Sequence, residues 1–112
     1  MKKINILILT VLIFISPLSN AQAIQIKGMP SCGNWISERE KSDNKPDYAN
    51  RLWLLGYMSG IAAGTNKNFL PGTDSDSIYL WMDNYCKSHP LKNVSDGGLY
   101  LYFELLEQKG IN

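Results

Sequence analysis

The sequence predicts an all-α protein, a compact bundle of about four helices with one disulfide, formed after removal of a signal peptide. Apolar residues recur at helical spacing in several stretches that are separated by turn-forming residues. No stretch alternates apolar and polar residues as a half-buried strand does. The chain has only two cysteines, and both lie beyond the predicted signal peptide.

Residues 1–23 have the three parts of a secretory signal peptide. Lys2 and Lys3 give a positive start, residues 4–15 are mostly apolar, and Ala-Gln-Ala at 21–23 fits a cleavage site. The apolar run is too short to span a membrane. We therefore expect export, most simply to a bacterial periplasm, and no membrane attachment after processing.

The processed chain is one domain of residues 24–112. Removing 23 of the 112 residues leaves 89, which is enough for a single domain. The signal peptide carries two of the 11 basic residues, so nine basic residues face ten acidic ones and the formal charge is −1. This balance gives no electrostatic footprint for nucleic acid or for an anionic membrane surface.

Cys32 and Cys86 are the two cysteines of the processed chain. In an oxidising compartment such a pair usually forms a disulfide. The bond would close a loop of about 55 residues and stabilise the fold by about 4 kcal/mol on the chain-entropy model. The alternative is a pair of separate thiols used for chemistry or metal binding. We favour the disulfide, because there is no Cys-x-x-Cys and the single histidine lacks nearby ligands.

Ser31 is a suitable N-cap for a first helix over 32–41, which carries Trp35 on its apolar side. The polar turn 42–46 ends that helix. A second helix is expected over about 47–65. It is apolar on most of its sides, which predicts that it is buried on most sides and forms the central element.

A loop over 66–72 leads to a third helix over 75–88, which begins behind capping residues and ends before Pro90. Its amphipathic stripe consists of Ile78, Trp81, Met82, Tyr85 and Cys86. A fourth helix is expected over 95–109, with Gly97 and Gly98 weakening its first turn. We expect one side of it to line the core through Val94, Leu99, Tyr102, Phe103 and Leu106.

Three glycines, Gly56, Gly60 and Gly64, are spaced by four along the second helix and therefore share one face. Glycine is costly inside a helix, so three on one line call for an explanation. Close packing against the third or fourth helix is the simpler interpretation. The alternative is a homodimer seam or a groove that receives a partner.

Four residues are candidate contacts for a protein partner. Phe69 and Leu70 stand at the tip of the 66–72 loop, which we expect to be exposed. Tyr79 and Tyr100 fall off the apolar stripes of their helices, so we expect both to face solvent. Exposed tyrosines are frequent anchors in protein interfaces.

The sequence predicts no catalytic residues, no metal site and no cofactor. There is no Gly-x-Ser-x-Gly elbow, and His89 lies at a helix end beside a proline. The acidic run 74–77 lacks the glycine and late glutamate of a calcium loop, so helix capping explains it better. We therefore expect a protein that is not an enzyme.

Three segments carry a resemblance to a known family: the run Leu-Gly-Tyr-Met-Ser-Gly-Ile-Ala at 55–62, Phe-Leu-Pro at 69–71, and Tyr-Cys-Lys-Ser-His-Pro at 85–90. They resemble Tai-type immunity proteins, small exported helical proteins that protect bacteria from peptidoglycan amidases of type VI secretion. Those proteins have a cysteine before the loop proline and another at the end. This chain has Leu70 at the first place and no cysteine after Cys86.

A second resemblance is to HdeA-type periplasmic acid chaperones. It rests on the early Cys-x-x-Trp at 32–35, the central Gly-Tyr helix and the late cysteine just before a proline. The similarity covers residues 31–107. The expected function is a periplasmic protein-binding domain, immunity- or inhibitor-like, that occludes a cell-wall-directed enzyme such as a peptidoglycan-degrading effector. The alternative is an HdeA-like acid-stress chaperone.

Overall fold

The computed structural model describes residues 23–41 and 47–112. These residues form four helices and no strand: α2 (Cys32–Glu40), α3 (Tyr48–Thr65), α4 (Ser75–Ser88) and α5 (Val94–Lys109). The predicted all-α fold of four helices is therefore confirmed. Residues 1–22 of the predicted signal peptide and the predicted polar turn 42–46 lie outside the described residues.

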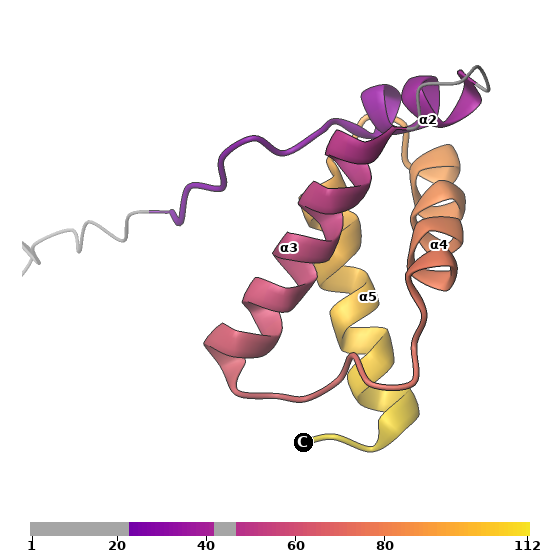
Figure 1. Cartoon of the computed structure of the whole chain (residues 1–112). Coiled ribbons are helices and arrows are strands. Elements are labelled where there is room, and N and C mark those ends of the chain that lie inside the picture. The colour runs from indigo at the N-terminus through magenta and orange to yellow at the C-terminus, as the bar shows by residue number, and fades with distance from the viewer. Residues whose placement is uncertain (1–22, 42–46) are drawn as a thin grey trace, which may run out of the picture.

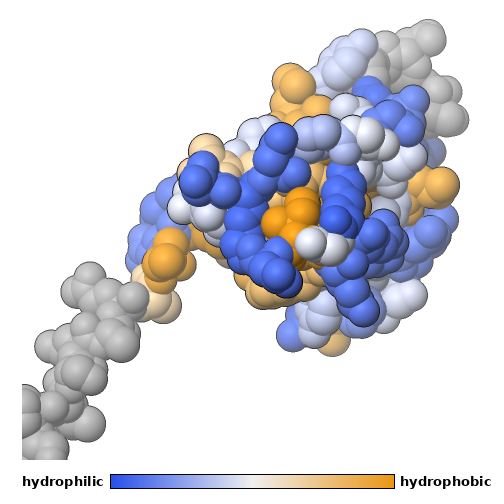
Figure 2. Space-filling view, turned by 90° about the horizontal axis from the view of Figure 1, so that it is seen from below, coloured by the Kyte–Doolittle hydropathy of each residue, from blue (hydrophilic) through white to orange (hydrophobic). Residues whose placement is uncertain are grey.

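The helices contact one another in the order α2, α4, α5, α3. Figure 1 shows α3, α5 and α4 running along the length of the bundle, with α2 across one end. The α3–α4 loop and the C-terminus lie at the opposite end. Figure 2 views that opposite end, where hydrophilic residues surround one apolar patch.

The helix ends agree with the capping residues in the sequence. The Ser31 side chain accepts a hydrogen bond from the backbone N–H of Asn34 at 3.0 Å, and Asp74 accepts one from Ser77 at 2.7 Å. These bonds satisfy N–H groups that have no partner within the helix. Gly110 ends α5 with φ +62°, a left-handed conformation that glycine adopts without strain.

A disulfide joins Cys32 at the start of α2 to Cys86 near the end of α4, with the Cα atoms 4.8 Å apart. Both cysteines are fully buried. The same end of the bundle is tied by backbone hydrogen bonds from Cys32 N to Lys92 O at 2.9 Å and from Val94 N to Pro30 O at 3.0 Å. The predicted pairing is thus present, within the hydrophobic core.

Helix α3 is not the central element that the sequence predicts. Only Leu54 and Met58 of this helix are buried, while Leu52 is 65% exposed. Its main contact is with α5, so a single face meets the core and most of its other positions are open. The core lies between α2, α4 and α5 as well as α3, with Trp35, Phe69 and Met82 among its fully buried side chains.

Two helices pack closely against α5 at Gly97 and Gly98. A Cβ atom at Gly97 would lie 2.7 Å from Met82 Sδ, and one at Gly98 would lie 2.7 Å from Tyr57 Cε1. Absent side chains at these two positions let α4 and α3 both approach the first turns of α5. The two residues that weaken the helix locally therefore permit the packing on both of its sides.

The buried side of α5 differs from the predicted one. Val94 and Tyr102 are buried as expected and Leu106 is half-buried, but Leu99 is 42% exposed and Phe103 61% exposed. Leu101 and Leu105 take their places in the core. In α4 the predicted stripe is confirmed, since Trp81 is half-buried and the other four residues are buried.

Candidate protein-binding surface

The exposed face of α3 is open at its three glycines. Among the described residues, nothing lies within 4 Å of the position that a Cβ would take at Gly56, Gly60 or Gly64. Close packing of this face against another helix of the domain, the simpler of the two interpretations, is therefore wrong. The reason is geometric: Leu54 and Met58 turn to α5, and the glycines stand on the other side of the helix.

An apolar groove runs along this glycine face. Its volume is about 710 Å³. It is lined by Ile24, Ile26, Gly56, Tyr57, Gly60, Ile61 and Leu99. The lining thus brings together the segment before α2, the middle of α3 and the start of α5, and none of its residues carries a formal charge.

A second hollow, of about 360 Å³, adjoins the apolar groove through a shared residue, Leu99. The other residues that line it are Asp96, Tyr100 and Phe103. Tyr100 is 66% exposed and Phe103 61% exposed, so two exposed aromatic rings line the hollow next to the groove. We call the groove and this hollow together the α3–α5 surface.

Charge is sparse on α3, whose only charged residue is Arg51 near its start. Tyr57 forms part of the groove and stacks on Trp53, with the ring centroids 5.0 Å apart. Burial, and then the nearby carboxylate of Asp96, raise the pKa of Tyr57 above its ordinary value. Tyr57 is therefore neutral at physiological pH, and the groove stays apolar.

The four predicted contact residues have different surroundings. Tyr100 is exposed as expected, and Leu70 is half-buried. The predicted exposure of Phe69 and Tyr79 is wrong. Phe69 is fully buried, with its ring edge-on to Tyr102 at 4.9 Å, and Tyr79 is 8% exposed because α2 covers that flank of α4 and brings Trp35 to a centroid distance of 6.4 Å.

Leu99 and Phe103 are surface residues, although the sequence predicts that they line the core. They lie four residues apart, on a side of α5 different from that of Leu101 and Leu105. Apolar residues occupy more of the α5 surface than its two neighbours, α3 and α4, cover. This excess is the signal in the sequence, since a helix that is apolar around more of its circumference than its neighbours cover keeps an apolar side for another contact.

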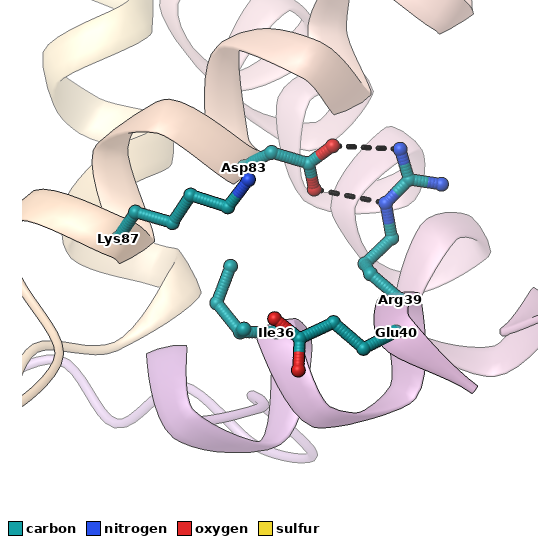
Figure 3. A pocket seen from close by; sticks show the side chains of 5 residues that line it. All are labelled: Ile36, Arg39, Glu40, Asp83 and Lys87. Carbon is teal, nitrogen blue, oxygen red and sulfur yellow. Dashed lines mark hydrogen bonds and ion pairs between the residues drawn. The ribbon is translucent and has the colours of Figure 1, made fainter. Parts of the chain in front are cut away.

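A third hollow, a polar pocket of about 210 Å³, lies between α2 and α4. Figure 3 shows Arg39 of α2 bonded twice to Asp83 of α4, with Ile36, Glu40 and Lys87 around the hollow. The two hydrogen bonds measure 2.8 and 2.7 Å, and Trp35 Nε1 donates a third to Asp83 at 2.8 Å. Both carboxylate oxygens are thus engaged, so we interpret this cluster as a structural tie.

The contacts of Asp83 favour the ionised form of its carboxylate. Burial raises the pKa of Asp83, but the hydrogen bonds from Arg39 and Trp35 and the positive charges of Arg39 and Lys87 together outweigh it, so the pKa lies below its ordinary value. The Asp83 hydrogen bond likewise raises the pKa of Arg39. The carboxylate of Asp47, at the start of α3, lies 3.9 Å from Arg39 Nε and 3.1 Å from Arg51 Nε, so the charged groups link three helices.

Within residues 23–41 and 47–112, no group of three or more His, Cys, Asp and Glu side chains is placed to hold a metal ion. His89 lies at the C-cap of α4, with Nδ1 2.9 Å from the Tyr85 carbonyl oxygen and its ring stacked on Tyr85. No helix in the described part of the chain is long and apolar enough to span a membrane.

Comparison of the chain with models of protein families, with curated protein sequences and with solved structures gives no match in any of the three. The α3–α5 surface consists of a groove without formal charge and a neighbouring hollow lined by two exposed aromatic rings.

Proposed function

We propose that this protein is a non-enzymatic, periplasmic protein-binding domain of the immunity or inhibitor type, which binds a cell-wall-directed enzyme through the α3–α5 surface. The observation that carries the proposal is the exposure of Tyr100 and Phe103 beside an uncharged groove. Aromatic side chains around an apolar centre are typical of the residues that contribute most of the binding energy in protein interfaces.

The composition of the surface favours a protein partner. An exposed apolar patch of this kind in a water-soluble domain usually marks an interaction site. Three open glycines on α3 allow the backbone of a partner, or a loop of it, to approach closely. The same features would suit a second copy of the chain, because the groove lining carries no formal charge and so has no like-charge repulsion with itself.

The resemblance of residues 55–62, 69–71 and 85–90 to Tai-type immunity proteins supports a specific kind of partner, a peptidoglycan-degrading effector. In this proposal the domain covers the active cleft of that enzyme and performs no chemistry itself. The α3–α5 surface would enter or cap the cleft, and Tyr100 and Phe103 would be its anchors.

The test is capture of a partner from periplasmic extract at pH 7 by the oxidised, processed protein, followed by an affinity measurement with the purified partner. We expect one stoichiometric hydrolase, whose activity falls on binding. Tyr100→Ala should weaken binding by about tenfold or more, as expected for loss of an aromatic anchor. Tyr48→Ala is the matched control, because Tyr48 is also a tyrosine and is 62% exposed, but lies outside the residues that line the surface.

The outcome that would contradict this function is capture of many proteins in acid and none at pH 7. That result would favour the second candidate, an acid-stress chaperone of the HdeA type. The Arg39–Asp83 tie supports this candidate, because protonation of Asp83 at low pH would weaken the attachment of α2 to α4 while the disulfide kept the chain compact. A hydrolase that binds Tyr100→Ala and the wild type equally would place the interface elsewhere.

A further inference from the structure

The segment before α2 is fixed at one end beside the groove. The Lys27 carbonyl accepts a hydrogen bond from Trp53 Nε1 at 3.0 Å. The chain then turns at Gly28, whose φ is +69°, and a Cβ there would lie 3.4 Å from the same indole nitrogen. A residue other than glycine would be strained at this φ, and the hydrogen bond to Trp53 holds Lys27 against the first half of α3.

From Gly28 onward the chain is held by the bundle. The Pro30 carbonyl accepts from Val94 N at 3.0 Å, and Ser31 pairs with Asn93 in an isolated bridge. In the other direction the segment leaves the bundle next to the start of α3, as Figure 1 shows, and Ile24 is 92% exposed. The segment is therefore held at Lys27, and its apolar residue Ile24 is exposed.

The pattern of this segment fits the groove. In an extended chain alternate residues share a side, so Ile24 and Ile26 project together while Gln25 projects the other way. Both isoleucines line the apolar groove together with Gly56 and Gly60. The groove in turn leaves room for two side chains, since nothing among the described residues stands within 4 Å of a Cβ at either glycine.

The lengths also agree. Three extended residues from Lys27 to Ile24 reach about 10 Å. Along α3, the seven residues from Trp53 to Gly60 rise by about 10 Å. Ile26 can thus reach the level of Gly56 and Ile24 that of Gly60, whereas Gly64 lies one turn beyond. Cleavage after Ala23, as the sequence predicts, would end the segment where this part of the groove ends.

We propose that residues 24–27 form a strap that closes along α3, with Ile26 seated at Gly56 and Ile24 at Gly60, and that a protein partner must displace this strap to reach the groove. The occupant is thus the chain's own first processed segment, which is held beside the groove at Lys27. Closure of the strap follows from the geometry of residues 24–28 and of the glycine face of α3. Only its displacement by a partner rests on the proposed function.

Closure is tested by nuclear Overhauser contacts in the processed, oxidised protein with labelled isoleucine methyl groups. We expect contacts from the Ile24 methyls to the Gly60 α-protons and from Ile26 to Gly56. Gly60→Leu should fill the space that Ile24 occupies at Gly60 and abolish the Ile24 contact. It should also speed amide exchange at residues 24–26 by at least about tenfold. Gly64→Leu is the matched control on the same open face, and should leave the contacts and the exchange unchanged.

Three outcomes would overturn closure. One is the absence of both contacts in the wild type; another is an equal effect of Gly60→Leu and Gly64→Leu. The third is contacts that disappear on dilution, which would assign the groove to a second copy. Unchanged methyl shifts of the core residue Val94 in both variants would show that each remains folded.

Displacement is tested separately with the partner. The double change Ile24→Ser and Ile26→Ser should raise affinity by about threefold or more, because the groove no longer has a competing occupant. Leu91→Ser is the control, since Leu91 is 98% exposed on the α4–α5 connection. An unchanged affinity would overturn displacement while leaving closure in place. Failure to find any partner would count against the proposed function and not against the strap contacts.

Discussion

The indole nitrogen of Trp35 donates to the same carboxylate of Asp83 that holds Arg39, at 2.8 Å. Trp35 is fully buried, and Asp83 has only 13% of its side chain exposed. One carboxylate thus satisfies a buried donor and binds a guanidinium through both of its oxygens. The position of the short helix α2 depends on this contact, on the disulfide and on the burial of the Trp35 ring.

Asp83→Asn should destabilise the fold by about 2 kcal/mol, because hydrogen bonds to charged partners contribute about 1.5–3 kcal/mol. The pKa of Asp83 lies below its ordinary value, so its stabilisation is present above the unfolded pKa and is lost as pH falls through the folded one. The wild type should therefore lose more stability than the variant between pH 5 and pH 2. Denaturant unfolding of both proteins at several pH values checks this, and parallel pH profiles would contradict it.

Gly97→Ala and Gly64→Ala should change stability in opposite directions. At Gly97 the new methyl group would lie 2.7 Å from Met82 Sδ and from Tyr85 Cδ1, and such overpacking costs about 1–3 kcal/mol. At Gly64 it would meet nothing among the described residues, and the higher helix propensity of alanine should stabilise α3 by up to about 1 kcal/mol. Thermal unfolding of the two variants measures the difference. Equal changes would show that Met82 and Tyr85 can move to admit a methyl group at Gly97.

Phe69→Ala should cost about 3–5 kcal/mol, as removal of a buried phenylalanine does. The ring is fully buried against Tyr102, and the Phe69 carbonyl accepts a hydrogen bond from Lys109 Nζ at 2.6 Å. Lys109 also donates to the Pro71 carbonyl, so the loop is held to the end of α5. Leu91→Ala, at an exposed site, should stay within about 0.5 kcal/mol of the wild type. A similarly small effect of Phe69→Ala would mean that the loop is not part of the core.

Replacing both Cys32 and Cys86 with alanine should lower the free energy of unfolding by about 4 kcal/mol on the chain-entropy account, since the bond closes a loop with a sequence separation of 54. Guanidinium unfolding of the double variant, with helix content followed by circular dichroism, is the measurement. A loss below about 1 kcal/mol would show that residual structure restrains the unfolded chain about as much as the bond does.

The helices were predictable because their signals are local. Ser31, Asp74 and Gly110 mark ends that depend on backbone groups within one turn, and the range 75–88 agrees with α4 at both ends. The disulfide was predictable from the number of cysteines. Neither inference needs to know which helix lies against which.

The candidate site was harder to predict because exposure depends on the neighbours of a helix. Tyr79 lies off the α4 stripe but is buried, since α4 has α2 on one side and α5 on another. Gly60 and Gly97 look alike in sequence, yet only Gly97 has another helix against it. Periodicity gives the faces of a helix, while the burial of each face follows from packing that the periodicity does not specify.

The covalent link between Cys32 and Cys86 also determines how the domain would bear a mechanical load. A pull applied at Ile24 and at Asn112 would pass from the first segment through the bond into the end of α4 and then along α5. Residues 33–85, which include all of α3, lie outside that load path. If the chain were stretched between Ile24 and Asn112, α5 would be drawn out first, and the backbone of α3 would bear tension only after the bond itself had been reduced.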